Sequence, residues 1–89
     1  DEIPVDEIVK EINAFDEIKN VHHIHVWQLN EEEIHFEAHI DFETDITLTE
    51  FEIILSKIEK LLFNKFEINH VNIQPEYGKD DVKDIIVQD

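Results

Sequence analysis

The chain has 89 residues, a formal net charge of -16 and no cysteine. This length predicts one small domain with a marginal core, because so short a chain buries only a little over ~60% of the surface that its unfolded form exposes. The acidity argues against nucleic acid as a partner, since phosphate recognition needs clustered Lys and Arg, and it favours cations. Any metal would have to be bound by imidazole and carboxylate groups. No apolar run approaches the ~18 residues of a membrane span, so the chain as given is expected to be soluble.

The first half of the chain predicts a helix followed by a β-hairpin. Pro4 precedes apolar residues at helical spacing, which indicates a short amphipathic helix at about residues 5–15. Residues 21–29 are β-branched and aromatic without helical spacing, and residues 30–32 fit a hairpin turn. Strict alternation of apolar and polar side chains over residues 33–43 predicts a return strand with one packed face and one polar face.

The second half predicts a longer helix and a last strand. Residues 49–52 resemble a capping box, and the apolar residues that follow form a single stripe as far as Phe66. A strand is expected over residues 70–76, where Pro75 marks its end or a sheet edge. Residues 78–89 form a charged tail that we expect to be weakly ordered.

The order helix, strand, strand, helix, strand predicts an α+β sandwich. The hairpin makes the first two strands antiparallel, and a crossover through the second helix would return the third strand parallel to the second. Both helices would then cover one face of a three-stranded mixed sheet. The other face is left bare and needs water, a ligand or a partner.

Five of the six histidines lie between residues 22 and 39, and the sixth is His70. His39 on the central strand could be flanked by His22 on one side and by His70 or Glu76 on the other. Three histidines and a carboxylate form a ligand set that zinc, cobalt or cadmium accepts. The alternation of the first strand is ambiguous, however, and a slip of one residue would move His22 and His39 to opposite faces.

The remaining polar residues have ordinary interpretations. His35 lies on an acidic strand face and is expected to be an exposed polar residue, while His23 and His25 can simply fill a sheet surface. Residues 31–33 are three glutamates and read as a solvated turn. Catalysis is not indicated, because the chain has no Gly-rich phosphate loop and its single serine, Ser56, lies inside a predicted helix.

Three ordered motifs resemble a known family. Residues 21–29, VHHIHVWQL, resemble the V-H-x-hydrophobic-H-hydrophobic-W signature in the cytoplasmic domain of cation diffusion facilitators, the cation efflux transporters of the cobalt-zinc-cadmium resistance and zinc transporter types. Residues 38–40, AHI, match next, and residues 68–76, INHVNIQPE, look like the final H-x-T-I-Q-x-E strand of the family. The likeness covers about residues 4–77.

This resemblance implies a ferredoxin-like, metallochaperone-like sandwich over residues 1–77, at the cytoplasmic face of the cell membrane. It implies a homodimer that binds Zn2+, or Co2+ or Cd2+, and thereby promotes transport by the transmembrane domain of the same full-length chain. The ligands carried over from the family are His22, His39, His70 and Glu76. No enzymatic activity is implied.

Two other interpretations stay open at this point. The chain could be a free-standing ferredoxin-like module that dimerises through its open sheet face and binds metal incidentally. A zinc hydrolase would need an open coordination position in a cleft, which nothing in the sequence indicates. Six upstream apolar spans of ~20 residues in the full gene product would decide for the transporter.

Overall fold

A computed structural model of the chain describes residues 3–79 and residue 85. Its elements, in chain order, are α1 (Val5–Asn13), β1 (Ile18–Asn30), β2 (Glu33–Phe42), α2 (Leu48–Phe66) and β3 (His70–Glu76). The predicted α+β order with two helices and three strands is confirmed. The expectation of weak order in residues 78–89 falls mostly on residues 80–84 and 86–89, which lie outside the described residues.

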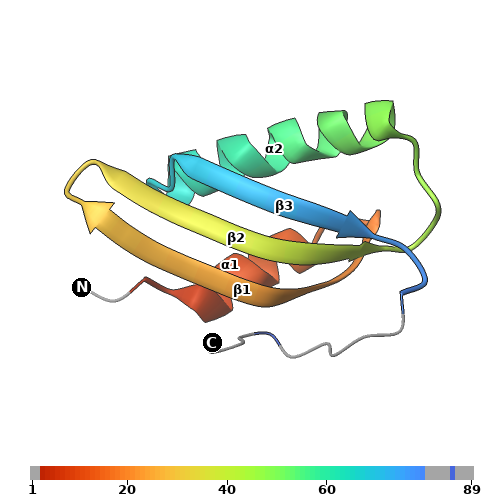
Figure 1. The fold of residues 1–89 in the computed structure, drawn as a ribbon, viewed down its shortest axis with the longest axis horizontal. Helices are drawn as coiled ribbons and strands as arrows, with labels where there is room; N and C mark the ends of the chain where they lie inside the picture. The colour runs from red at the N-terminus through yellow and green to blue at the C-terminus, as the bar shows by residue number, and fades with distance from the viewer. Residues whose placement is uncertain (1–2, 80–84, 86–89) are drawn as a thin grey trace.

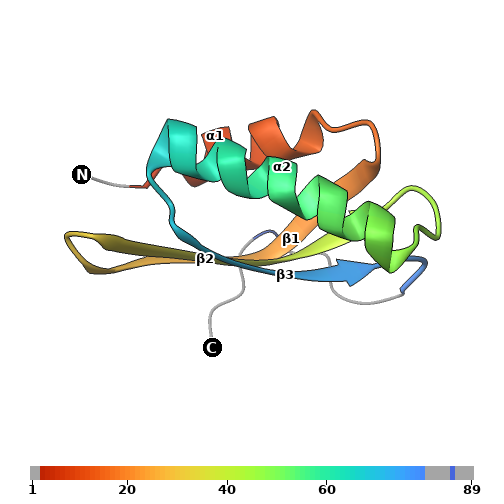
Figure 2. The same cartoon turned by 90° about the horizontal axis from the view of Figure 1, so that it is seen from above.

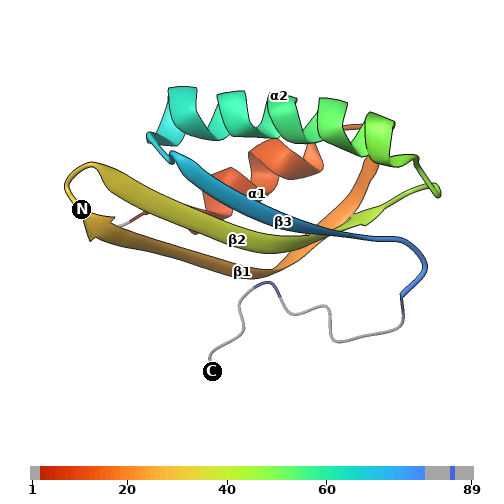
Figure 3. The ribbon, with the colours of Figure 1, turned by 45° about the horizontal axis from the view of Figure 1, so that its top comes forward.

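The sheet has the strand order β1-β2-β3, so β2 is the central strand (Figure 1). Strand β1 pairs antiparallel with β2, and β3 pairs parallel with β2, as the hairpin and the helical crossover predict. Both helices lie on the same face of the sheet (Figures 2 and 3). The buried core cluster includes residues of both helices and all three strands. Neither helix of the described residues lies on the opposite face of the sheet.

Helix α1 is shorter than its sequence pattern predicts. It ends at Asn13 rather than near residue 15, and β1 begins at Ile18, three residues before the predicted strand. The reason lies in the core, because Ile8 and Ile12 are fully buried by the first two turns and Ile18 is already buried opposite Phe42. The helix therefore ends once the apolar side chains of its first two turns are buried.

The start of α2 differs from the prediction by two residues. The N-cap is Thr47, whose Oγ1 accepts a hydrogen bond from the backbone N–H of Glu50 at 3.1 Å, while Glu50 Oε1 accepts one from the backbone N–H of Thr47 at 2.9 Å. The sequence offers two overlapping S/T-x-x-E patterns, and the structure uses the earlier one instead of the one that begins at Thr49. The backbone hydrogen bond from Thr47 lowers the pKa of the Glu50 carboxyl.

Strand β1 contains a β-bulge that no periodicity predicts. His22 pairs with His39 and His25 pairs with Glu37, so three steps along β1 match two steps along β2. The extra residue is at His23, whose φ of 53° lies in the left-handed region. Histidine is one of the few residue types enriched there.

The bulge separates the apolar and polar residues of β1 onto opposite faces. Val21 and Ile24 are both buried in the core although they lie three positions apart, an odd spacing that a regular strand would place on different faces. His22 and Trp27 are thereby turned to the face without helices, where they meet histidines of β2. This explains the ambiguous alternation of the segment.

Candidate metal centre

Three of the predicted ligands meet on the open face of the sheet, and we call them the Glu76 cluster: His22 on β1, His39 on β2 and Glu76 at the end of β3. His22 Nε2 lies 3.0 Å from Glu76 Oε1, and His39 Nδ1 lies 2.7 Å from Glu76 Oε2. All three ligand atoms lie within 4.8 Å of one another. The carboxylate therefore stands between two imidazoles from two different strands.

The Glu76 carboxyl group is almost completely removed from solvent. Its side chain is 2% exposed, and that of His22 is 1% exposed, whereas that of His39 is 28% exposed and leaves an approach from solvent. Asp41, which pairs in register with Glu76, is also buried. Two buried carboxyl groups on adjacent strands are destabilising unless positive charge lies close by. In the described residues such charge includes the Lys79 ammonium, whose Nζ lies 3.5 Å from Glu76 Oε2.

The hydrogen bond to Asn20 determines which nitrogen of His22 faces the carboxylate. His22 Nδ1 lies 2.8 Å from Asn20 Oδ1, which is an acceptor, so Nδ1 is assigned as the N–H donor. In the neutral imidazole Nε2 then carries the lone pair that points at Glu76. A metal-binding histidine typically donates its other N–H to an oxygen in this way, which fixes the ring and its tautomer.

His39 adds a second nitrogen without an ordinary hydrogen bond. Its Nδ1 is buried and, among the described residues, has no hydrogen-bond partner of good geometry, although Glu76 Oε2 is only 2.7 Å away. The two atoms therefore converge without donating to each other. Such convergence suits ligands that share a cation, because tetrahedral zinc with bonds of 2.0–2.1 Å holds its ligand atoms about 3.3 Å apart.

The pairing of His22 with His39, which the sequence left open, is settled by the bulge: the two are direct cross-strand neighbours. The fourth predicted ligand, His70, does not lie with the other three. His70 opens β3, six residues before Glu76, and thus lies about 20 Å from the Glu76 cluster along the strand. In the parallel register His70 pairs with His35, not with His39.

His70 belongs instead to a second group of potential ligands, the Glu33 cluster, which consists of Glu33, His35 and His70. Glu33 Oε1 lies 3.4 Å from His70 Nε2 and 3.7 Å from His35 Nε2. His35 was expected to be an exposed polar residue, but its side chain is only 24% exposed. The sequence signal that was missed is the spacing of Glu33 and His35, two residues apart on one strand face.

Aromatic rings cover much of the open face. His25, Trp27, His35 and His70 form a continuous stack with centroid distances of 4.5, 4.9 and 4.2 Å. His23 stacks on His39 at 4.7 Å, next to the Glu76 cluster. The two interpretations of His23 and His25 as surface-filling residues are consistent with these contacts, since neither belongs to a ligand group among the described residues.

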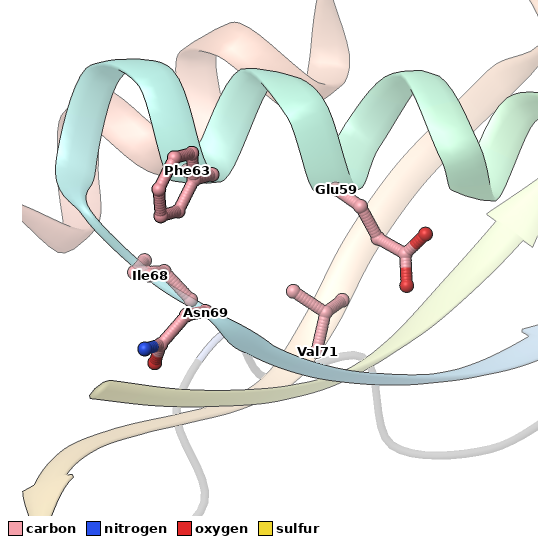
Figure 4. A pocket seen from close by; sticks show the side chains of 5 residues that line it. All are labelled: Glu59, Phe63, Ile68, Asn69 and Val71. Atoms are coloured by element: carbon pink, nitrogen blue, oxygen red, sulfur yellow. The ribbon is translucent and has the colours of Figure 1, made fainter. Parts of the chain in front are cut away.

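An apolar hollow of about 240 Å3 lies between α2 and the start of β3 (Figure 4). It is lined by Glu59, Phe63, Ile68, Asn69 and Val71. One carboxylate among apolar groups does not make a ligand set, so this hollow is a less suitable site than the open face. On that face a hollow of about 280 Å3 adjoins His39 and another of the same size adjoins His35 and His70.

The chain is similar to known proteins. Residues 1–77 match the family model described as cation efflux protein, cytoplasmic domain. The chain belongs to this family. The cation efflux domain is 35% identical over 74 residues to the cadmium, cobalt and zinc/H(+)-K(+) antiporter of Bacillus subtilis, which covers 83% of this chain and 24% of the relative. It is 33% identical over 61 residues to zinc transporter ZitB of Escherichia coli, with 68% of this chain and 18% of the relative covered.

A solved structure supports the same assignment. The metal-bound C-terminal domain of the CzcD transporter from Cupriavidus metallidurans superposes with a TM-score of 0.70 at 31% identity, covering 83% of this chain and 99% of that chain. The cation efflux domain thus spans about a quarter or less of the curated transporters it matches, and nearly the whole of a solved C-terminal domain. Within residues 3–79, no helix is long and apolar enough to cross a membrane.

Proposed function

We propose that this cation efflux domain is the cytoplasmic regulatory domain of a divalent cation transporter. In this proposal it binds Zn2+, or Co2+ or Cd2+, and pairs with a second copy to promote transport by a membrane domain of the same full-length chain. The observation that carries the proposal is the Glu76 cluster, in which a buried carboxylate lies within 3.0 Å of imidazole nitrogens from two other strands.

The chemistry of the cluster supports a borderline transition metal. Two imidazole nitrogens and one carboxylate oxygen suit Zn2+ better than Mg2+ or Ca2+, which prefer all-oxygen ligands. Asn20 already orients His22, and the exposure of His39 leaves room for a water or a further ligand in the fourth position. Binding would place positive charge between His22 and Glu76 and would compensate two buried carboxyl groups.

The open face supports the homodimer. Both helices cover the other side of the sheet, so the face that bears the two clusters and the aromatic stack is the one left for a second copy. A metal bound at that face stabilises one arrangement of two copies to the extent that it binds that arrangement better. The transporters to which the chain is similar favour this reading over a free-standing module, because each is several times longer than this chain.

Zinc titration by calorimetry tests the metal site. His39→Ala should weaken the Glu76 cluster at least about tenfold, because even the outer-shell partners of metal ligands are worth 10–100-fold in affinity. The matched control is His25→Ala, which removes an exposed histidine of the same face that belongs to neither cluster. If the two variants titrate alike, the acidic surface binds zinc diffusely and the assignment of the site is wrong.

The pH dependence separates histidine from carboxylate binding. Zinc affinity should fall steeply between pH ~7.5 and ~5.5, because imidazole binds metal only when neutral and its reference pKa is about 6.5. A flat profile would mean that carboxylates alone bind the ion.

Sedimentation tests the dimer. A chain that remains monomeric at ~100 μM, with and without zinc, contradicts it, since even a micromolar interface is populated at that concentration.

A further inference from the structure

We infer that the Glu33 cluster is a second divalent metal site, formed by Glu33, His35 and His70 and selective for first-row transition metals such as Zn2+, Ni2+ or Co2+. The inference goes beyond the function proposed above, and it shares no residue with the Glu76 cluster. The two groups lie at opposite ends of β3, so one ion cannot serve both.

The distances in this cluster are close to those of a coordination sphere. Glu33 Oε1 is 3.4 Å from His70 Nε2 and 3.7 Å from His35 Nε2, against about 3.3 Å between the ligand atoms of tetrahedral zinc. His35 Nε2 is buried and has no hydrogen-bond partner within the part of the chain that the structure describes. A buried nitrogen without a hydrogen-bond partner destabilises the folded state unless a hydrogen-bonding group or a metal ion binds it.

Neighbouring side chains orient the carboxylate. Asn30 Nδ2 donates a hydrogen bond of 2.9 Å to Glu33 Oε2, which leaves Oε1 directed toward the two histidines. The same hydrogen bond, followed by the positive charge that His70 and His35 can carry, lowers the pKa of Glu33, so that it is an anion at neutral pH. Asn30 therefore orients Glu33 by a hydrogen bond, as Asn20 orients His22.

Asn69 fixes the distance between the strands that supply the ligands. Its Oδ1 accepts a hydrogen bond from the backbone N–H of Ile34 at 3.0 Å, and its Nδ2 donates one to the carbonyl oxygen of Glu32 at 2.6 Å. Figure 4 shows Asn69, which directly precedes β3 and its first residue, His70. The first residues of β2 and β3, and with them all three ligands, are thus held together by side-chain as well as backbone hydrogen bonds.

The site is open on one side and walled by Trp27 on the other. Trp27 stacks on His35 with a centroid distance of 4.9 Å, and a hollow of about 280 Å3 adjoins both histidines. Three protein ligands with access from solvent leave a fourth position for water. This arrangement suits an exchangeable ion rather than a permanently enclosed structural one.

The fluorescence of Trp27, the single tryptophan of the chain, reports on this site directly. Ni2+, an open-shell ion, quenches a nearby indole, and excess Zn2+ should displace it and restore the emission. We expect saturable quenching in the wild-type chain and in His39→Ala. The Ni2+ affinity should fall at least about tenfold in His35→Phe, which keeps the aromatic stack but removes the nitrogen ligand, and also in His70→Ala. His25→Ala, which removes the ring on the other side of Trp27, should leave the affinity unchanged.

Zinc stoichiometry distinguishes this inference from the proposed function. Calorimetry should give two zinc ions per chain for the wild type, and one for both His35→Phe and His39→Ala. One ion that is lost only in His39→Ala overturns the second site and leaves the proposed function standing. One ion that is lost only in His35→Phe supports the second site and overturns the assignment of the Glu76 cluster. Quenching that is equal in all variants overturns the second site in favour of diffuse binding.

Discussion

Replacing His23 by valine tests whether the bulge of β1 holds the histidine face in register. His23 has a φ of 53°, a left-handed conformation that costs an L-residue about 1–2 kcal/mol. Asparagine, aspartate and histidine tolerate it best, and β-branched residues least. His23→Val should therefore lose about 1–2 kcal/mol of unfolding free energy relative to His23→Asn.

The Asn variant isolates the backbone effect. Both substitutions remove the stacking of His23 on His39, so their difference reports the conformational cost and not the lost contact. His23→Asn keeps a residue type that tolerates the left-handed conformation, so its loss relative to the wild type should be limited to the contacts of the His23 ring. In thermal unfolding followed by circular dichroism, each kcal/mol moves the midpoint by roughly 4–8 °C in a domain of this size. His23→Val should thus melt about 4–16 °C below His23→Asn.

Zinc binding by the same variants gives a second readout. If the valine chain escapes the strain by closing the bulge, the pairing beyond it slips by one residue and His22 no longer faces His39. Its zinc affinity should then fall while that of His23→Asn is kept. Equal midpoints and equal affinities for the two variants would refute the claim that the left-handed residue holds the register.

Four further outcomes are expected. At a free zinc concentration of ~100 dissociation constants, binding should stabilise the folded chain by ~2.7 kcal/mol and raise the unfolding midpoint by on the order of ten degrees. His39→Ala should lose the part of this gain that comes from the Glu76 cluster, while its metal-free midpoint stays that of the wild type. Thr47→Ala should cost about 1 kcal/mol in urea unfolding. Glu50→Gln should be less stable than the wild type at neutral pH, and the difference should vanish as the pH falls below 4.5 through the lowered folded-state pKa of Glu50, because protonation then removes the same charge. Lys79→Ala should raise zinc affinity about 2–5-fold in calorimetry, since an exposed charge this close is worth up to ~1 kcal/mol.

The elements that could be predicted are those whose periodicity is local. The strict alternation of β2 and the long apolar stripe of α2 are visible in the sequence, and both appear in the structure with nearly the expected bounds. The N-cap of α2 was missed because Thr47 and Thr49 both precede a glutamate by three residues. Nothing local distinguishes them. The choice depends on where the connection from β2 allows the first turn to form.

The register of the sheet could be predicted only in part. The pairing of His22 with His39 depends on the extra residue at His23, and although histidine is enriched in the left-handed region, its presence alone does not predict a bulge. Whether Glu76 or His70 joins His39 depends on the parallel pairing of β2 with β3. Side-chain hydrogen bonds between Asn69 and residues more than thirty positions earlier in the chain help to fix that pairing, and no sequence window contains both partners.

The contacts of Glu76 place Lys79 in competition with an ion at the proposed metal site. In the metal-free protein this buried carboxylate receives a hydrogen bond of 3.1 Å from Gln74 and the charge of Lys79 at 3.5 Å, in addition to the two imidazoles. A divalent ion bound at the proposed site between His22 and His39 would repel the Lys79 ammonium and would take over its role in compensating the carboxylate. The Lys79→Ala variant measures the strength of this competition for Glu76.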